Sequence, residues 1–547
     1  MVLFFLSSYA SAQQEQAESM DAEFYNNRGL TYMKKGQYDR AISDYTKALK
    51  INPRYARAYY NRGIAYGKKD QFDRAIADFT KAIEIDPKYA AAYYKRGFAY
   101  DNKDQYDRAI ADFTKAIEID PRYADAYNNR GMTYVEKGQY DQAISDFNKA
   151  IKINPRFAAA YNSRGITYVR KGQYDRAISD FNKAIKIYPR FAGAYSNRGI
   201  AYGKKGQYDR AISDHTKAIE IDPKYARAYY NRGMTYVGKG QHDQAISDFT
   251  KAIEIDPRYA AAYYNRGIAY DNKDQYDRAI SDFTKAIQID PRYAEAYNNR
   301  GIAHGKKGQY DRAISDFTKA IKIDPRFAKA YNYRAIAYGK KDQYDRVISD
   351  LTKAIEIDPK YAEAYNNRGM AYYNKDQHDQ PISDFTKAIE IDPRYAEAFY
   401  NRGVAYDNEG QYDQAISDFT KAIEIDPGYA EAYNNRGITY VEKGQYDQAI
   451  SDYTKALKIN PKSAEAHYNR GMAYGQKGKY GRAISDYTKA IEINPRFAEA
   501  YYNRGIAYYY KKEYDKSLED VEKAKKLGYQ TSPKFIETLR KASGKPN

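Results

Sequence analysis

The sequence offers few of the side chains that enzymes and metal centres use. The chain has 547 residues, with no Cys and only five His. Without Cys there can be no disulfides, thiolate nucleophiles, or Cys-ligated zinc or iron–sulfur sites. Five His leave little material for a His-based metal or acid–base site.

Two short motifs imitate known sites but fail in detail. Residues 199–205 resemble a phosphate-binding loop, yet the spacing is one residue short and no Ser or Thr follows the Lys. Residues 101–104 hint at a calcium loop but lack its Gly and closing Glu. No triad, carboxylate pair or metal cluster is recognisable. The sequence predicts a protein that is not an enzyme and has no cofactor or metal.

The five His all stand where the sequence otherwise places an aromatic residue. They are His215, His242, His304, His378 and His467. We interpret them as substitutions inside a packing pattern and not as ligands or acid–base groups.

A 34-residue period underlies the whole composition. Gly29 and Gly63 are 34 residues apart, as are Pro53 and Pro87, and the period runs through residues 22–531 without insertion. This gives fifteen repeats, numbered below from position 1 (residue 22 in the first repeat) to position 34. The chain is one continuous array and not several globular domains.

Each repeat reads as a helix–turn–helix. In residues 294–327, apolar side chains recur at three- and four-residue steps over 294–304 and again over 310–321, which predicts two helices. Polar residues 306–309 separate them, and Asp324-Pro325 ends the second. One hairpin cannot cover its own apolar face, so neighbouring hairpins must stack.

The spacing of aromatic, Gly, Ala and Pro residues resembles the tetratricopeptide repeat family. Position 4 is aromatic (Tyr25, Tyr59, Tyr93), position 8 is Gly in 14 of 15 repeats, and position 32 is Pro in 14 of 15. The resemblance implies an all-α, right-handed α-solenoid superhelix. It also implies a concave groove, lined by the first helices, that binds peptides or protein segments.

Position 7 departs from that family, because all fifteen repeats carry Arg where Leu is expected. A charged group between helices needs a partner. Position 23 is Asp in all fifteen repeats, including the five in which position 19 is Gln and offers no cation. We predict a structural pair between helices, within a repeat or between neighbours, for example Arg266 with Asp282. The alternative is a groove of free arginines.

Position 6 is Asn in 12 of 15 repeats, and a carboxamide can hold a peptide group without reading a side chain. This Asn ladder resembles the groove of the O-linked N-acetylglucosamine transferase superhelix, which grips extended peptides; that enzyme's catalytic domain has no counterpart here. The alternative is that Asn bonds a neighbouring backbone group or Tyr hydroxyl. The ladder comprises Asn27, Asn61, Asn129, Asn197, Asn231, Asn265, Asn299, Asn367, Asn401, Asn435, Asn469 and Asn503. Additional Tyr at position 5 are expected to face the groove as contacts: Tyr60, Tyr94, Tyr230, Tyr264 and Tyr400.

Irregular repeats and the two ends carry separate expectations. Residues 328–393, with Ala335 for Gly and Pro381 for Ala, are expected to show altered curvature or softness. Residues 532–547 are expected to form a capping helix and tail, with Phe535, Ile536 and Leu539 on its buried side. Residues 1–12 read as a truncated signal peptide and 13–21 as a polar linker. That predicts a periplasmic or secreted protein; the alternative is a frayed tail on a cytoplasmic one.

These features favour a non-catalytic scaffold that binds extended protein or peptide segments. Nucleic-acid binding is the alternative, because the net charge is +18 and the chain holds 65 Tyr. Against it, the charges alternate in sign along the second helix, which is typical of a solvated face. The mean hydropathy of −0.90 predicts no membrane-spanning segment in the mature chain. The sequence indicates no oligomeric state.

Overall fold

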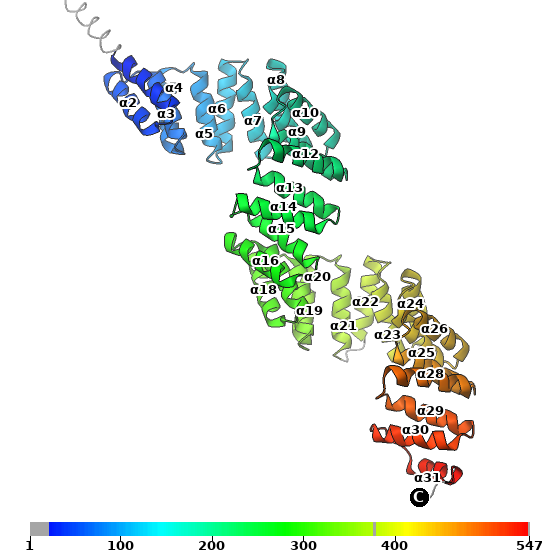
Figure 1. Ribbon diagram of the computed structural model, residues 1–547. Coiled ribbons are helices and arrows are strands. Elements are labelled where there is room, and N and C mark those ends of the chain that lie inside the picture. The colour runs from blue at the N-terminus through cyan, green and yellow to red at the C-terminus, as the bar shows by residue number, and fades with distance from the viewer. Residues whose placement is uncertain (1–20, 376–378, 545–547) are drawn as a thin grey trace, which may run out of the picture. The chain divides into compact units, whose positions relative to one another are not determined.

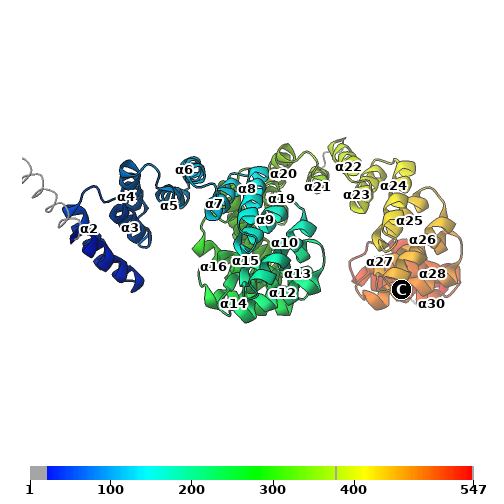
Figure 2. The same ribbon diagram turned by 90° about the horizontal axis from the view of Figure 1, so that it is seen from above.

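The computed structural model describes residues 21–375 and 379–544, and all regular secondary structure in those ranges is helical. The chain forms two compact units that divide between Asp274 and Gln275. Each unit is an all-α solenoid in which helical hairpins follow one another in chain order (Figures 1 and 2).

In the first unit, residues 21–34 are helical and lead into the numbered helices. These are α2 (Tyr38–Ile51), α3 (Ala56–Gly67), α4 (Phe72–Ile85), α5 (Ala90–Asp101), α6 (Tyr106–Ile119), α7 (Ala124–Glu136), α8 (Tyr140–Ile153), α9 (Ala158–Arg170), α10 (Tyr174–Ile187), α11 (Ala192–Lys204), α12 (Tyr208–Ile221), α13 (Ala226–Gly238), α14 (His242–Ile255) and α15 (Ala260–Asp271).

The second unit continues the alternation of first and second helices. It contains α16 (Tyr276–Ile289), α17 (Ala294–Lys306), α18 (Tyr310–Ile323), α19 (Ala328–Gly339), α20 (Tyr344–Ile357), α21 (Ala362–Tyr373), α22 (Asp379–Ile391), α23 (Ala396–Asn408), α24 (Tyr412–Ile425), α25 (Ala430–Glu442), α26 (Tyr446–Ile459), α27 (Ala464–Gln476), α28 (Tyr480–Ile493), α29 (Ala498–Tyr510), α30 (Tyr514–Lys526) and α31 (Pro533–Ala542).

Local chemistry sets where each helix begins and ends. The turn inside a hairpin needs a residue with positive φ, and this is usually Gly, as at Gly308 (φ 73°), or Asp, as at Asp342 (φ 56°). After the second helix, a side chain such as that of Asp324 accepts a hydrogen bond from the backbone N–H of Arg326 at 2.9 Å. This turn closes the helix just before Pro.

Each hairpin stacks on the preceding one through its first helix. In each unit the second helix of a repeat packs on the first helix of the next, and first helices of consecutive repeats also contact one another, as α19 and α21 do. No comparable contact joins consecutive second helices within the described residues. The first helices therefore share one face of each unit, and that face is the candidate groove.

A close approach at position 8 fixes the packing inside each hairpin. A Cβ atom added to Gly63 would lie 2.6 Å from the ring of Phe79 on the second helix, which is too close for any real contact. The tenth repeat holds Ala335 instead, and there the ring is replaced by Leu351; both are fully buried. The two departures compensate for each other sterically.

The irregular stretch 328–393 keeps its helices. Pro381 has no N–H to donate, whereas the residue at this position in other repeats donates to the carbonyl four residues earlier, as Ala41 does to Gln37 at 3.1 Å; the helix still runs from Asp379 to Ile391. Altered curvature or softness there stays a prediction, and His378 lies outside the described residues.

Helix α31 covers the end of the last repeat. Its Ile536 and Leu539 are buried against Leu518 and Val521 of α30, with Phe535 packed beside them. At the other end, the predicted signal peptide and nearly all of the predicted linker lie outside the described residues.

Candidate ligand-binding groove

The arginines of position 7 are held inside the hairpins. In fourteen repeats the guanidinium donates two bonds to the Asp at position 23 of the same repeat. In the twelfth, Arg402 Nε and Nη2 reach the two oxygens of Asp418 at 2.7 and 2.9 Å, and the side chains are 17% and 6% exposed. These arginines are structural and do not form a free cationic groove.

The same guanidinium also links neighbouring repeats. Arg402 Nη1 donates to Thr386 Oγ1 of the preceding repeat at 3.0 Å, and its cation lies 5.7 Å from the Phe399 ring. Arg28 has no repeat before it, and its side chain is 39% exposed. Stacking thus completes the burial of each arginine.

The pair named from the sequence falls on the division between the two units. Arg266 belongs to the first unit, where its Nη1 donates to Thr250 Oγ1 at 2.9 Å, and Asp282 belongs to the second, where it is buried. Their mutual pairing stays a prediction.

The remaining His in described positions follow the packing pattern. His215 replaces the ring at position 24 and is 1% exposed, and burial lowers its pKa to about 3. His467 contacts the buried carboxylate of Asp486 at 3.3 Å. Burial favours the neutral acid at Asp486, but the bonds from Arg470 and His467 hold its pKa below the ordinary value. Within the described residues no group of three His, Asp or Glu could hold a metal ion.

The Asn ladder of position 6 joins consecutive first helices. The Nδ2 group donates to the position-5 side chain of the preceding repeat, 35 residues earlier. Ten bonds of this kind occur: Asn61 to Asn26, Asn129 to Tyr94, Asn197 to Asn162, Asn231 to Ser196, Asn265 to Tyr230, Asn367 to Asn332, Asn401 to Asn366, Asn435 to Tyr400, Asn469 to Asn434 and Asn503 to Tyr468.

These bonds match the alternative reading of the Asn ladder, in which Asn bonds a neighbour, but they use only part of each amide. No donor in the described part of the chain reaches Oδ1 of Asn367 or Asn503. Asn27, in the first repeat, is exposed, and Asn299 lies just after the division between the units. A ligand role for the ladder therefore rests on the carboxamide oxygen, Oδ1, and not on the Nδ2 group that bonds the preceding repeat.

The Tyr residues of position 5 are half-buried between rings. The Tyr60 ring lies 4.9 Å from Tyr89 and 5.9 Å from Phe79, centroid to centroid. Tyr94, Tyr230 and Tyr400 repeat this arrangement, and their hydroxyls accept the Asn bonds. Tyr264 occupies the same position next to the division between the units. Their role as ligand contacts stays a prediction.

Equivalent cavities open between the first helices of consecutive repeats at several places in the described part of the chain. Three of them have volumes of about 220, 230 and 350 Å³ and lie at repeats 10/11, 2/3 and 14/15. Each is lined at position 12 by Gly: Gly339, Gly67 and Gly475. Position 6 of the next repeat also lines each one, as Asn367, Lys95 and Asn503.

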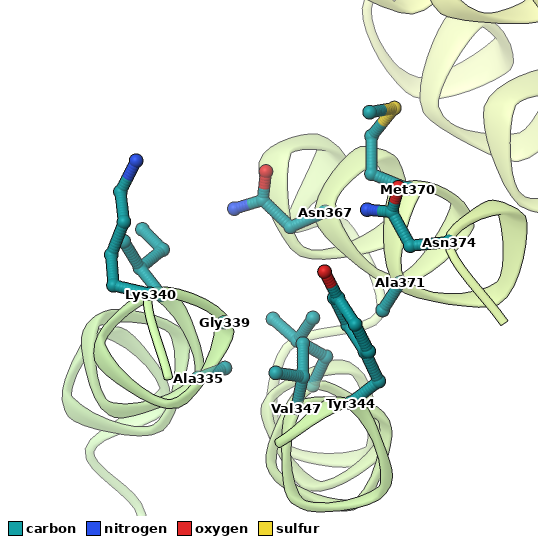
Figure 3. Close-up of a pocket in the computed structure, with 11 residues that line it drawn as sticks. Ala335, Gly339, Lys340, Tyr344, Val347, Asn367, Met370, Ala371 and Asn374 are labelled. Atoms are coloured by element: carbon teal, nitrogen blue, oxygen red, sulfur yellow. The ribbon is translucent and has the colours of Figure 1, made fainter. Parts of the chain in front are cut away.

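Figure 3 shows the cavity of repeats 10/11 in detail. Asn367 and Met370 project from α21 and Asn374 follows its last residue, and the Tyr344 hydroxyl rises from α20 toward them. Val347 forms part of the floor on α20, and Lys340, directly after α19, stands at the edge. The cavity thus combines an apolar floor with polar groups at its mouth.

Position 12 is the determinant that sequence reasoning missed. In repeats 3 and 4 a side chain at this position lies toward the next first helix: Val135 is 2% exposed, and Asp101 Oδ1 accepts a bond from Thr133 at 2.7 Å. Gly203 and Gly305 also stand at position 12, and the signal was the variation among Gly, Val, Asp, Tyr and Met there.

Comparisons with known proteins agree with this architecture. The family model "Tetratricopeptide repeat" matches eleven stretches that together exceed half of the chain: residues 56–89, 90–123, 124–157, 192–225, 226–259, 260–293, 294–327, 328–361, 362–395, 396–429 and 464–497. A second model described as "TPR repeat" matches 29–70, 167–206 and 439–478, and a third, also "Tetratricopeptide repeat", matches 147–179, 419–451 and 486–519.

Several solved structures are similar. A chain of the APC/C hetero-tetramer Cut9–Hcn1 is 16% identical, with 83% of this chain and 96% of that one covered and a TM-score of 0.44. MamA is 35% identical over 30% and 96%, with a TM-score of 0.28. YrrB, described as a TPR protein with an unusual peptide-binding site, is 30% identical over 34% and 97%, with a TM-score of 0.28. No curated protein matches.

The family assignment rests on the sequence models, whose frames start at the same repeat boundaries as the hairpins of the structure. Repeats of this kind form scaffolds that bind other proteins and are generally not catalytic. The chain belongs to the tetratricopeptide repeat family.

Proposed function

We propose that the first-helix face of this scaffold binds an extended protein segment through the side chains of position 6. The observation that carries the proposal is the place of these side chains: Asn367, Asn435 and Asn503 each line a cavity. The Nδ2 group of each Asn donates one hydrogen bond to the preceding repeat. That bond orients the amide. The carbonyl keeps a lone pair for a ligand N–H, also in Asn435, whose Oδ1 accepts one bond from Asn434 Nδ2 at 3.4 Å.

In this mode of binding, the groove contacts the backbone of the ligand more than its side chains. A peptide amide offers the same N–H and C=O at every residue, so a ladder of carboxamides can follow an extended chain of mixed composition. A net hydrogen bond contributes about 1 kcal/mol, and affinity then comes from several repeats acting together. The glycine-lined cavities add places for side chains.

Nucleic-acid binding draws less support from the same side chains. The arginines of position 7 are occupied by Asp, as described above, and lysines of position 14 pair with Asp at position 18 of the preceding repeat, as Lys137 does with Asp107. Much of the positive charge is therefore already neutralised locally. No helix in the described ranges has the length and apolar character needed to cross a bilayer.

The test substitutes three Asn residues of the ladder with a smaller polar residue that already occurs at position 6. Ser stands naturally at position 6 in the fifth repeat, as Ser163, so we choose the triple variant Asn367→Ser, Asn435→Ser, Asn503→Ser. Binding of a fluorescent library of random 12-residue peptides is measured by anisotropy. We expect broad weak binding to the wild type and a loss of about tenfold or more in the variant, since up to three bonds are removed.

The control carries Lys387→Ala, Lys421→Ala and Lys489→Ala on second helices, where each Lys pairs with an exposed Glu. Circular dichroism checks that both variants fold. Equal peptide affinity of the ladder variant, the control and the wild type would refute binding through position 6.

A further inference from the structure

A fourth cavity differs in character from the glycine-lined three. It lies at repeats 12 to 14, has a volume of about 340 Å³, and its lining includes Tyr400, Glu431, Asn434, Asn435, Ser463 and Glu465. Two carboxylates, three carboxamides and two hydroxyls face it, and no Lys or Arg is among its lining residues.

The cavity lies where a ring is absent from position 34. In several repeats with Tyr at position 5, the ring at position 34 packs on it, as Tyr429 does on Tyr400 at 4.9 Å and Phe497 on Tyr468 at 4.8 Å. The thirteenth repeat has Asn434 at position 5, as six other repeats have Asn there, and Ser463 at position 34, which is aromatic in thirteen repeats. Neither fills the space that the paired rings occupy in the neighbouring repeats.

The hydrogen bonds around the cavity leave its carboxylates available. Ser463 Oγ accepts from the backbone N–H of Ala466 at 3.1 Å and caps α27, and Asn435 donates to the Tyr400 hydroxyl at 3.0 Å. Glu431 and Glu465 form no ion pair within the described residues. In the eleventh repeat, by contrast, Glu363 accepts a bond from Asn332 at 3.1 Å.

Both carboxylates act on the same hydroxyl. Burial is the main cause of the raised pKa of Tyr400, and the charges of Glu431 and Glu465 raise it further. The two exposed glutamates therefore place negative charge at the mouth of one cavity, and its lining residues include no cation.

The chemistry that complements this space is a cation with several N–H donors on an apolar stem. The two carboxylates accept from an ammonium or guanidinium, and Ala430, Ala456 and Ala466 provide contacts for methylene groups. The amide oxygens of Asn434, Asn435 and Asn460 each already accept one bond and add only their second lone pairs. We propose that this cavity is a socket for a basic side chain, Lys or Arg, of the bound protein segment; this inference rests on the proposed groove function.

The probes are three fluorescent host peptides of 12 residues, built from Ala, Gly and Ser, with Arg, Lys or Gln at the centre. We expect the Arg or Lys peptide to bind the wild type about tenfold more tightly than the Gln peptide, because only a cation makes charge-assisted hydrogen bonds with the two carboxylates. Ser463→Tyr, which restores the residue type of most other repeats, removes that preference. So does the double variant Glu431→Gln, Glu465→Gln.

A matched control keeps the same change of charge away from the socket. Glu363→Gln with Glu397→Gln alters the equivalent two glutamates around Tyr395, where the ring is present. We expect this variant to retain the preference for Arg or Lys. Retention of the preference in Ser463→Tyr, or its loss in the control, would overturn the socket.

The two proposals fail differently. If the Gln peptide binds and the basic peptides gain nothing, the socket is wrong and the groove stands. If no peptide binds, the groove proposal is wrong, and the socket is tested alone by NMR titration with butylguanidinium. Binding to the wild type but not to Ser463→Tyr supports the socket, and equal or absent binding refutes it.

Discussion

Each arginine at position 7 is held by groups from two repeats, which makes it tolerable inside a hairpin. Arg402 is paired with Asp418 in its own repeat and with Thr386 in the one before. A bidentate carboxylate satisfies the fork geometry that Lys could not match. The charge is fully desolvated only when its hairpin packs on the preceding one, so folding and stacking are coupled at this residue.

Asp418→Asn is expected to destabilise the protein by about 3 kcal/mol, because it leaves the guanidinium of Arg402 without a counter-charge in a largely buried site. Urea denaturation together with hydrogen exchange in α23 and α24 measures the loss. Asp413→Asn is the control, since that carboxylate is 86% exposed in its pair with Lys443 and should matter by less than about 1 kcal/mol. Similar small effects for both would contradict a buried structural pair.

His215 gives the first unit a local sensitivity to acid. Its pKa is about 3 when folded and about 6.5 when exposed, so the unfolded chain binds the additional proton between these values. The stability contributed by neutral His215 is present above pH 6.5 and is lost as the pH falls toward 3. The variant His215→Phe restores the ring of most other repeats and should gain stability over the wild type as the pH drops from 7 to 4. A pH-independent difference in urea midpoints would show that His215 is protonated without cost.

At the scale of the element, the hairpin is set by a glycine and a ring. The Cβ of a side chain at position 8 would lie 2.8 Å from the Phe419 ring in the case of Gly403. The tenth repeat shows the accommodated form, in which Ala335 faces Leu351. The combined volume of the two side chains is constrained. A larger residue at position 8 is therefore tolerated when the facing side chain is smaller.

Gly403→Ala is therefore expected to cost about 1–3 kcal/mol through overpacking. Phe419→Leu alone leaves a cavity and also destabilises. The double variant should be more stable than the sum of the two losses implies, since Leu makes room for the new methyl group. Thermal melts of the four proteins form the cycle, and strict additivity would mean that the two residues do not meet.

At the scale of the whole molecule, the apolar face of a terminal repeat must be covered by something other than another repeat. Helix α31 does this at the last repeat through Ile536 and Leu539. Since each repeat contacts mainly its neighbours, a defect at the end should stay local.

Leu539→Asp should expose the end of α30 and speed amide exchange in α29 and α30, while α23 to α26 keep their protection. Hydrogen–deuterium exchange with mass spectrometry resolves these segments. Lys534→Asp, on the exposed side of the same helix, should change neither region. Uniform loss of protection across the second unit would instead indicate one cooperative body.

Much of this molecule follows from its sequence. The 34-residue period set the hairpins, Asp-Pro set the helix ends, and the persistence of Asp at position 23 beside Gln at position 19 identified the partner of Arg. Phe535, Ile536 and Leu539 marked the inner side of α31. These features depend on residues within one hairpin or one helix, where spacing along the chain already fixes proximity.

Tertiary structure alone decided which hydrogen bonds and cavities the groove contains. Asn435 bonds to Tyr400 across 35 residues, Gly339 leaves a cavity that Val135 fills in another repeat, and Ser463 opens a polar space by withholding a ring. Each outcome depends on the volumes and hydrogen-bonding groups of side chains brought together from several packed helices. Periodicity gives the place of each side chain in its helix, but only the stacked hairpins determine which space is filled and which polar atom is left for a ligand.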